Sequence, residues 1–138
     1  MTEGDARWWC GYSSPPPANS PSLRFLEMTS PFQSADLAAA AARARAADGY
    51  AARVLASDLL SVGVYVLPAG GEDLQTPHRE DEVYYVVRGS SRFRAGAEEV
   101  AVGTGSLLFV RAGVDHRFFD VAEELVLVVF WAPPEKSV

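Results

Sequence analysis

Residues 76–82 read Thr76-Pro77-His78-Arg79-Glu80-Asp81-Glu82, and an apolar run rich in aromatic and β-branched residues follows directly. The segment holds one of the two histidines in this chain of 138 residues. The other, His116, ends a second turn-rich segment and also leads into a strand-like run. Two imidazoles and a carboxylate carried by separate strands are enough for a small β-barrel to bind a metal. The sequence therefore predicts a shared site wherever these two segments meet.

The composition indicates one globular domain with its own core. Hydrophobic residues make up 49% of the chain and the net charge is −6, a length and balance that need no disulfide support. This acidity argues against nucleic acid and anionic membrane surfaces as partners. The apolar runs are too short to span a bilayer, the first residues do not read as a secretory signal, and Cys10 is alone. A cytoplasmic protein is expected.

The first quarter of the chain is expected to lie outside the main domain. Residues 1–33 include the proline-rich segment 13–22, which cannot form a helix or an inner strand. We interpret 1–33 as an N-terminal arm or linker, 34–134 as the main domain with a leading helix, and 135–138 as a C-terminal tail. An alternative is that Trp8, Trp9 and Tyr12 dock onto a neighbouring subunit.

A single helix is predicted between Ser34 and Asp48. Ser34 is a natural N-cap, Asp36 adds negative charge near the first turn, and the alanine-rich run after it has high helix propensity. Gly49 follows where a C′ residue belongs. Such a thin helix can lie close against a sheet, and its residues carry no chemistry.

From Tyr50 onward the pattern changes to short strands separated by Gly and Pro turns. The run 83–87 is rich in aromatic and β-branched residues and is closed by Gly89, and the run 91–95 is expected to pair with it as a hairpin. The other expected strands are 51–56, 60–67, 100–102, 106–110, 116–119 and 125–131. Eight short strands are typical of an all-β sandwich or barrel.

At this point the sequence resembles the cupins, small jelly-roll barrels with two signature motifs. The first is Gly, five residues, His-x-His, three or four residues, Glu, six residues, Gly; it is matched by Gly70, Thr76-Pro77-His78, Glu82 and Gly89. The second is Gly, five residues, Pro-x-Gly, two residues, His, three residues, Asn; it is matched by Gly105, Arg111-Ala112-Gly113, His116 and Asp120. The resemblance covers about 34–133 and implies a double-stranded β-helix, or jelly-roll barrel.

Three positions depart from the family pattern. Arg111 replaces the usual Pro and Asp120 the usual Asn, both at turns or strand ends. Thr76 stands where the family has its first His, so the usual site of three imidazoles and one carboxylate is reduced. The segment 75–82 also resembles the motif of a branch of the cupins in which this motif contains a single His and an acidic cluster.

The resemblance implies one divalent metal ion, such as Fe, Zn, Mn or Ni, bound by His78, Glu82 and His116. Two imidazoles and one carboxylate on one face of a metal form the set used by non-haem Fe(II) oxygenases, and the same three ligands could hold Zn²⁺. Glu80 is the competing carboxylate, because in a regular strand it would share a face with His78 and Glu82. The family pattern places an irregularity there that turns Glu80 out, which favours Glu82.

Strand alternation predicts which residues line the cavity. If Glu82 points inward, Tyr84 and Val86 do as well, and Phe118 follows His116. Tyr84 is then the one phenol able to orient a substrate or donate a proton, or it simply fills the barrel. No Arg or Lys points inward on this register, which favours a partly hydrophobic small-molecule ligand over a phosphate. Tyr85 and Val87 face outward and suggest a homodimer.

These observations predict a metal-binding cupin that acts as a dioxygenase-like enzyme on a small organic molecule. The alternatives are a non-catalytic small-molecule-binding or sensor barrel, and a metal-assisted isomerase or hydrolase. Fold does not choose among them, because the scaffold hosts many functions.

Overall fold

The computed structural model describes residues 30–135, and the segments 1–29 and 136–138 lie outside the described residues. The proposed arm, with Trp8, Trp9 and Tyr12, falls almost entirely in the first of these segments. The elements, in chain order, are α2 (Leu37–Ala46), β1 (Tyr50–Ala56), β2 (Ser61–Leu67), β3 (Asp81–Ala95), β4 (Glu98–Gly103), β5 (Leu107–Val110) and β6 (His116–Ala132).

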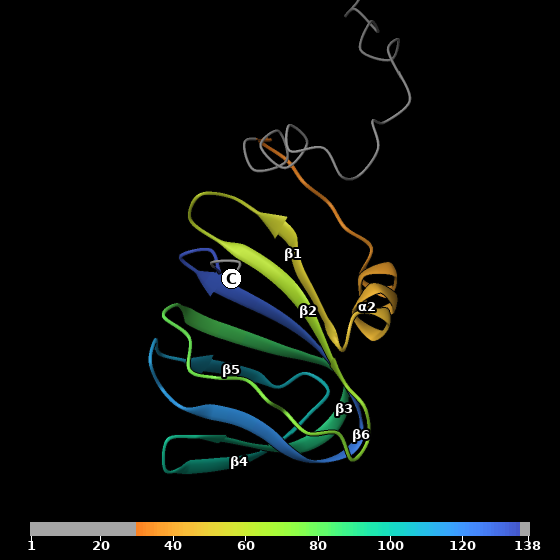
Figure 1. Ribbon diagram of the computed structural model, residues 1–138, viewed down its shortest axis with the longest axis vertical. Coiled ribbons are helices and arrows are strands. Elements are labelled where there is room, and N and C mark those ends of the chain that lie inside the picture. Colours follow the sequence, from red (N-terminus) through yellow and green to blue (C-terminus); the bar gives the residue numbers. More distant parts are fainter. Residues whose placement is uncertain (1–29, 136–138) are drawn as a thin grey trace, which may run out of the picture.

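The strands form one antiparallel sheet that curls on itself into a barrel (Figure 1). Its order is β1-β2-β6-β3-β4, with β5 paired to β3. The two longest strands, β3 and β6, pair along their whole length. The first half of β3 also pairs with β5, and its second half pairs with β4. The predicted all-β double-stranded β-helix with one leading helix is therefore confirmed.

The prediction of eight short strands is wrong in one respect, because two pairs of expected strands are continuous. The runs 83–87 and 91–95 both belong to β3, and 116–119 and 125–131 both belong to β6. The run 91–95 does not fold back on 83–87 but forms its hairpin with β4. Gly89 does not end the strand: its φ of 102° lets the chain bend there, with register shifts between Val86 and Arg92.

The helix begins later than predicted. Asp36, not Ser34, is the N-cap, and its carboxylate accepts a hydrogen bond from the Ala39 amide at 3.3 Å. At the other end Asp48 takes the left-handed C′ position with φ 56°, and the amide of Gly49 donates to the Ala44 carbonyl at 2.7 Å. This is a Schellman ending with Gly49 one position further along than expected.

The alanines let this helix lie flat against the sheet, as predicted. Ala40, Ala41 and Ala44 are buried against Val64 and Val126. Val87, expected to face outward, packs partly against this cluster, so the helix covers part of the outer face.

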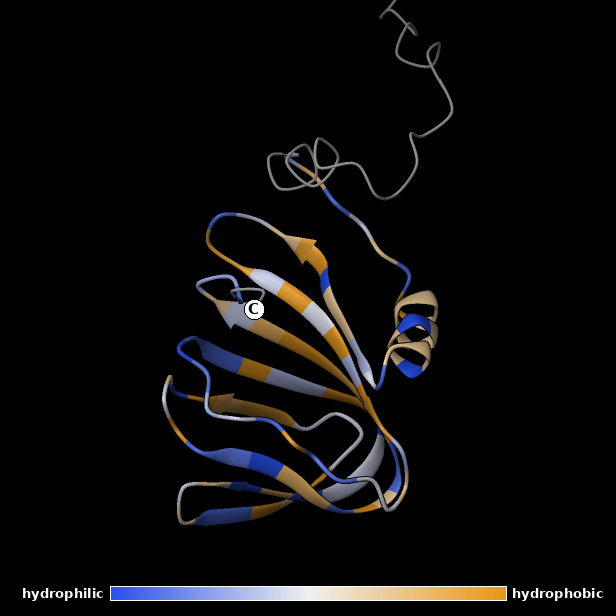
Figure 2. Ribbon diagram, in the orientation of Figure 1, coloured by the Kyte–Doolittle hydropathy of each residue, from blue (hydrophilic) through white to orange (hydrophobic). Residues whose placement is uncertain are grey.

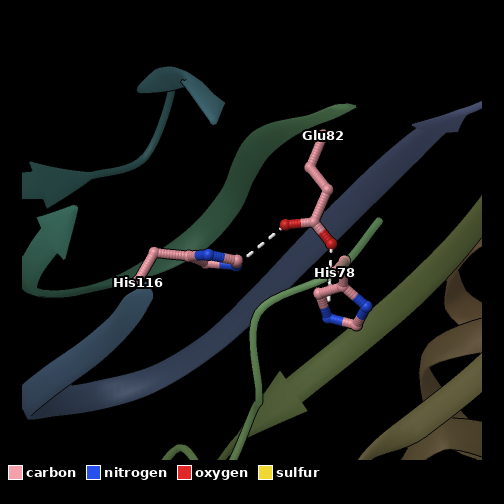
Figure 3. A group of neighbouring side chains, drawn as sticks. All are labelled: His78, Glu82 and His116. Carbon is pink, nitrogen blue, oxygen red and sulfur yellow. Dashed lines mark ion pairs between the residues drawn. The ribbon is translucent and has the colours of Figure 1, made fainter. Parts of the chain in front are cut away.

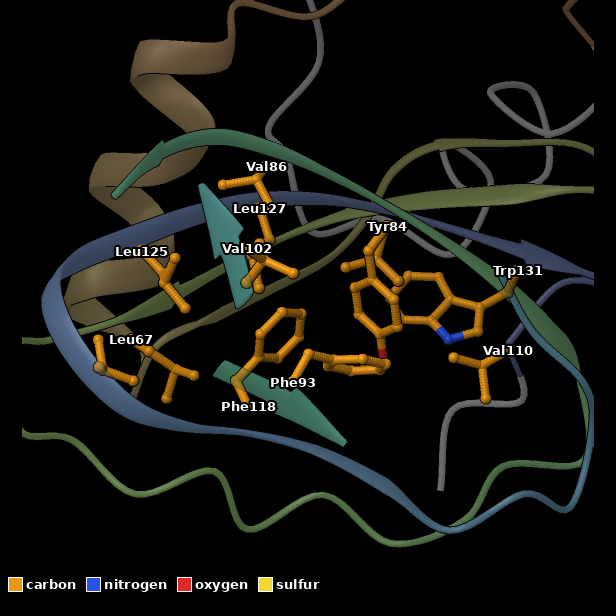
Figure 4. Close-up of a cluster of buried hydrophobic side chains, with 12 residues drawn as sticks. Leu67, Tyr84, Val86, Phe93, Val102, Val110, Phe118, Leu125, Leu127 and Trp131 are labelled. Atoms are coloured by element: carbon orange, nitrogen blue, oxygen red, sulfur yellow. The ribbon is translucent and has the colours of Figure 1, made fainter. Parts of the chain in front are cut away.

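The main core fills the inside of the barrel (Figure 4). Tyr84, Val86 and Phe118 are fully buried in it, which confirms their predicted inward direction. Along β2, apolar residues take turns with less apolar ones, whereas residues 125–131 of β6 are apolar throughout (Figure 2). In the part of the chain that the structure describes, no helix has the length and apolar character needed to cross a membrane.

Candidate metal centre

The structure brings His78, Glu82 and His116 together at one end of the barrel (Figure 3). One ligand atom from each residue lies within 4.8 Å of the others. Glu82 is the second residue of β3, His116 is the first residue of β6, and His78 lies on the coil that leads into β3. The amide of Gly113 donates to the His78 carbonyl at 2.7 Å, which fastens the two motif segments to each other.

Glu82 is the centre of the group and is 1% exposed. Its Oε2 lies 2.8 Å from Nε2 of His116, and its Oε1 lies 3.3 Å from Nε2 of His78. Oε1 also accepts a hydrogen bond from the indole N–H of Trp131 at 2.6 Å. A buried carboxylate is stable only with such partners, so this cluster holds Glu82 ionised inside the barrel.

The ring of His116 is oriented by a backbone contact. Its Nδ1 lies 2.8 Å from the Val114 carbonyl, which can only accept a hydrogen bond, so Nδ1 carries a proton. Nε2 is left pointing at Glu82. An N–H held by a carbonyl while the other nitrogen faces the site is the usual arrangement of a metal-binding histidine.

His78 supplies the second indication that the residues fit a metal. Its Nε2 is buried and has no hydrogen-bond partner, although Glu82 is close enough in distance to count as an ion pair. Nε2 of His78 is near the Glu82 carboxylate, but the two groups are not oriented for a hydrogen bond. An imidazole nitrogen aimed at a carboxylate without bonding to it leaves room for an ion between the two, and the set of two nitrogens and one oxygen suits a divalent transition metal.

Tyr84 reaches the same atoms from the barrel interior. Its hydroxyl lies 2.9 Å from Oε2 of Glu82, 2.9 Å from Nε2 of His116 and 3.0 Å from the side-chain oxygen of Gln75. The phenol is thus in place to exchange a proton or to hold a ligand, as predicted from strand alternation. Whether it does either stays a prediction.

Sequence reasoning missed the residues that support the site. Asp73 is 5% exposed, and its carboxylate accepts hydrogen bonds from the amides of Gln75 and Phe118 and from the Tyr65 hydroxyl. Asp73 also accepts from the side-chain amide of Gln75 and so aims that side chain at Tyr84. No motif marks Asp73; its only signal is a carboxylate between a Gly-rich turn and the first histidine.

Three other residues of the acidic segment lie outside the group of donor atoms. Thr76 is exposed. Asp81 is exposed and accepts from the Ala112 amide at 2.8 Å. Glu80 is also outside the cluster, as expected, but it is 6% exposed and therefore not a solvent-facing residue.

Asp120, which stands where the second motif usually has Asn, has a φ of 49°, a conformation that Asp and Asn tolerate better than most residues.

The pKa values of the site follow from burial and from these contacts. Burial opposes the charged form of Glu82, but the hydrogen bond from His116 and the charges of both histidines outweigh it and lower the pKa of the carboxyl. Burial likewise opposes imidazolium at His116, but Glu82 and the Val114 carbonyl outweigh it and raise the pKa. Burial and the charge of Glu82 raise the pKa of the Tyr84 phenol.

The Glu82–His116 pair predicts how stability depends on pH in the metal-free protein. The glutamate contribution is complete above its ordinary pKa of 4.5 and is lost as pH falls through the lowered value. The histidine contribution is complete below its ordinary pKa of 6.5 and is lost as pH rises through the raised value. We therefore expect the native protein to be more stable than Glu82→Gln. The difference in their free energies of unfolding should be largest at pH values between these two ordinary pKa values. Urea unfolding of both proteins with a chelator, at several pH values, measures the difference; a difference that does not vary with pH would contradict the pairing.

Comparison with known proteins shows which proteins this chain resembles. The family model described as "Cupin domain" matches residues 63–133. An uncharacterized protein of Streptomyces coelicolor is 43% identical over 88 residues, which are 64% of this chain and 84% of that protein.

Solved structures share the fold. An RmlC-like cupin with a double-stranded β-helix fold from Methanocaldococcus jannaschii superposes with a TM-score of 0.55 at 15% identity, over 62% of this chain and 81% of that one. The DMSP lyase DddQ from Ruegeria pomeroyi superposes with a TM-score of 0.58 at 23% identity, over 69% of this chain and 52% of that one. This chain thus spans about half the length of the lyase.

Proposed function

The chain belongs to the cupin family, and from that membership we propose that it is a metal-dependent enzyme of the dioxygenase type acting on a small organic molecule. One observation carries the proposal: two imidazoles and one carboxylate converge inside an apolar barrel. Three protein ligands leave other positions of a divalent metal open, whereas a closed set would bind metal without chemistry.

The chain's own residues have distinct tasks in this proposal. His78, Glu82 and His116 would hold the ion, and Trp131 keeps Glu82 in place through its indole N–H. When bound, the metal would supply Lewis-acid polarisation or, for iron, redox chemistry. The buried rings of Phe93 and Phe118, whose centroids are 4.7 Å apart, pack against Tyr84 and make the interior side of the site apolar.

The test is metal analysis followed by an activity measurement. Protein purified without chelator is analysed for metals, and the Fe(II)-loaded protein is then assayed for oxygen uptake with small phenols and thiols. Bound metal at one ion per chain with substrate-dependent oxygen uptake is the expected result. Bound metal without turnover of any compound would support a non-catalytic binding barrel, and protein that takes up no metal would overturn the proposal.

A second reaction class, metal-assisted isomerisation, hydrolysis or elimination, is favoured by Tyr84. Its hydroxyl touches two of the three proposed ligands and could pass a proton to or from a substrate held beside them. The barrel accommodates such chemistry elsewhere, since one structural neighbour is named a lyase. Oxygen-independent turnover would select this class.

The role of Tyr84 is testable in either reaction class. Tyr84→Phe keeps the ring in the core but removes the hydroxyl, so we expect metal content to persist and kcat to fall by about 100-fold or more. Tyr85→Phe is the matched control, because Tyr85 is the next residue and is 39% exposed on the outer face. Equal activities of the two variants would remove Tyr84 from the mechanism.

We also propose that the protein is a homodimer through the outer face of β3 and β5. Leu107 and Phe109 are 71% and 64% exposed, and they pair with Tyr85 and Val83 on β3. Among the described residues β5 pairs with β3 alone, so an apolar edge strand is left for another copy to cover. We expect Phe109→Glu to shift the mass measured by light scattering from dimer to monomer. The matched control is Val100→Glu on β4, whose Val is 46% exposed; a monomeric native protein would contradict the proposal.

A further inference from the structure

A cavity of about 710 Å³ opens beside the metal centre. His78 and Gln75 line it, and the wall continues along the end of α2, the start of β1 and the coil after β2. Of the three proposed metal ligands only His78 lines the cavity, so a molecule in it would contact the site through His78.

Aromatic side chains form one wall of the cavity. Tyr50 packs edge-on against Trp131 at 5.8 Å and against Tyr65 at 6.3 Å between ring centroids. All three rings line the cavity, and the two tyrosines are only half-buried. Aromatic rings attract cations through their electron-rich faces.

The charged residues of the same wall are mostly acidic. Four carboxylates line the cavity, those of Asp48, Glu72, Glu124 and Glu135, against one guanidinium, Arg45. Arg45 is already paired with Glu124 at 2.7 Å. Asp48 and Glu72 have no ion-pair partner among residues 30–135, so the cavity keeps an excess of negative charge.

Each tyrosine of the cavity also lies beside a carboxylate. Burial first, and then the neighbouring carboxylate of Glu135, raise the pKa of Tyr50, and burial and Asp73 raise the pKa of Tyr65. Burial opposes a charge of either sign, but the carboxylates oppose only an anion, so they would also disfavour an anionic ligand beside these rings. A cation would instead gain from both the carboxylates and the rings.

We propose that this cavity takes a small organic cation, an amine or a quaternary onium compound, as the substrate class of the metal centre. The proposal rests on the proposed function for the word substrate, but the cation preference belongs to the cavity itself. A phosphate or a carboxylate would find no free guanidinium or ammonium among the residues that line it.

The experiment uses three probes of nearly equal shape and different charge. Choline, its neutral carbon isostere 3,3-dimethylbutan-1-ol and the anion 3,3-dimethylbutanoate are titrated into the full chain by two-dimensional NMR, with metal content measured on the same samples. The quaternary nitrogen of choline cannot coordinate a metal, and the hydroxyl is common to choline and its isostere, so the difference between their affinities reports the cavity. We expect choline to bind about tenfold more tightly than the neutral isostere, and the anion to bind weakest in samples without metal, where its carboxylate has no ion to coordinate.

Matched variants locate the preference. In the double variant Asp48→Asn with Glu72→Gln we expect the ratio of choline to isostere affinity to fall at least about threefold. Both changes are conservative at exposed positions, and Asn suits the left-handed backbone at 48. Glu98→Gln removes one charge from the hairpin at the far side of the barrel, outside the cavity, and should leave the ratio unchanged.

Each outcome decides between the two proposals. Three results would each overturn the cation preference: equal affinities for choline and its isostere, no binding of choline, or equal ratios in the double variant and Glu98→Gln. If metal is present in the same samples, the metal proposal would still stand. A preserved preference in protein that takes up no metal would overturn the proposed function and leave the cavity's selectivity in place.

Discussion

Glu82→Gln is expected to lower metal affinity by more than about 100-fold. The substitution removes the one anionic ligand from a set of three, and loss of residues that merely support metal ligands already costs about 10- to 100-fold. The fold should survive, because a glutamine oxygen in the place of Oε1 can still accept from Trp131, which lies 2.6 Å from that atom. The amide nitrogen in the place of Oε2 can donate to the hydroxyl oxygen of Tyr84, which lies 2.9 Å from that atom. Titration of Zn²⁺ into chelator-treated protein, followed by calorimetry, measures the change.

Glu80→Gln is the matched control for this substitution. The residue is two positions earlier, carries the same charge and is also buried, at 6% exposure, yet it lies outside the group of donor atoms. We expect its metal affinity to stay within about threefold of the native protein, since the lost charge does not belong to a ligand. If Glu80→Gln lost the metal and Glu82→Gln kept it, the ligand set would have to be rewritten around Glu80.

The proposed ligands could be predicted from the sequence because the spacing of the motif residues can be recognised without knowing where each strand begins and ends. His78, Glu82 and His116 are each positioned by a turn and the first residues of a strand. The inward direction of Tyr84 and Val86 followed from the two-residue period of a strand. Both kinds of inference are local.

The supporting residues could not be predicted, because they depend on register between distant strands. Trp131 meets Glu82 because the two are directly opposed in the pairing of β6 with β3. Its alternation with Val129 and Leu127 would have indicated an inward ring, but not the partner. Asp73 lies on a coil, where no period applies. Its four hydrogen bonds become visible only when the coil is folded against Phe118 and Tyr65.

The continuity of β3 was also beyond reach of local patterns. A glycine after a strand normally reads as its end, and Gly89 instead bends a strand that passes from one side of the barrel to the other. The bend depends on close approach to β6, a strand that follows later in the chain. The sequence carries the glycine but not the neighbour that requires it.

That neighbour makes Gly89→Ala the substitution with the largest expected cost to stability. A Cβ at this position would lie 2.2 Å from the carbonyl oxygen of Glu124, which is backbone and cannot move aside, and the φ of 102° is unfavourable for any L side chain. We expect a loss of at least about 3 kcal/mol in the free energy of unfolding, measured by urea denaturation. Gly96→Ala is the control: its φ of 58° is also left-handed, but nothing lies within 4 Å of the added Cβ, so about 1 kcal/mol is expected. Equal losses would mean that left-handed backbone strain, and not the contact between β3 and β6, fixes the bend on which the placement of Glu82 beside His116 depends.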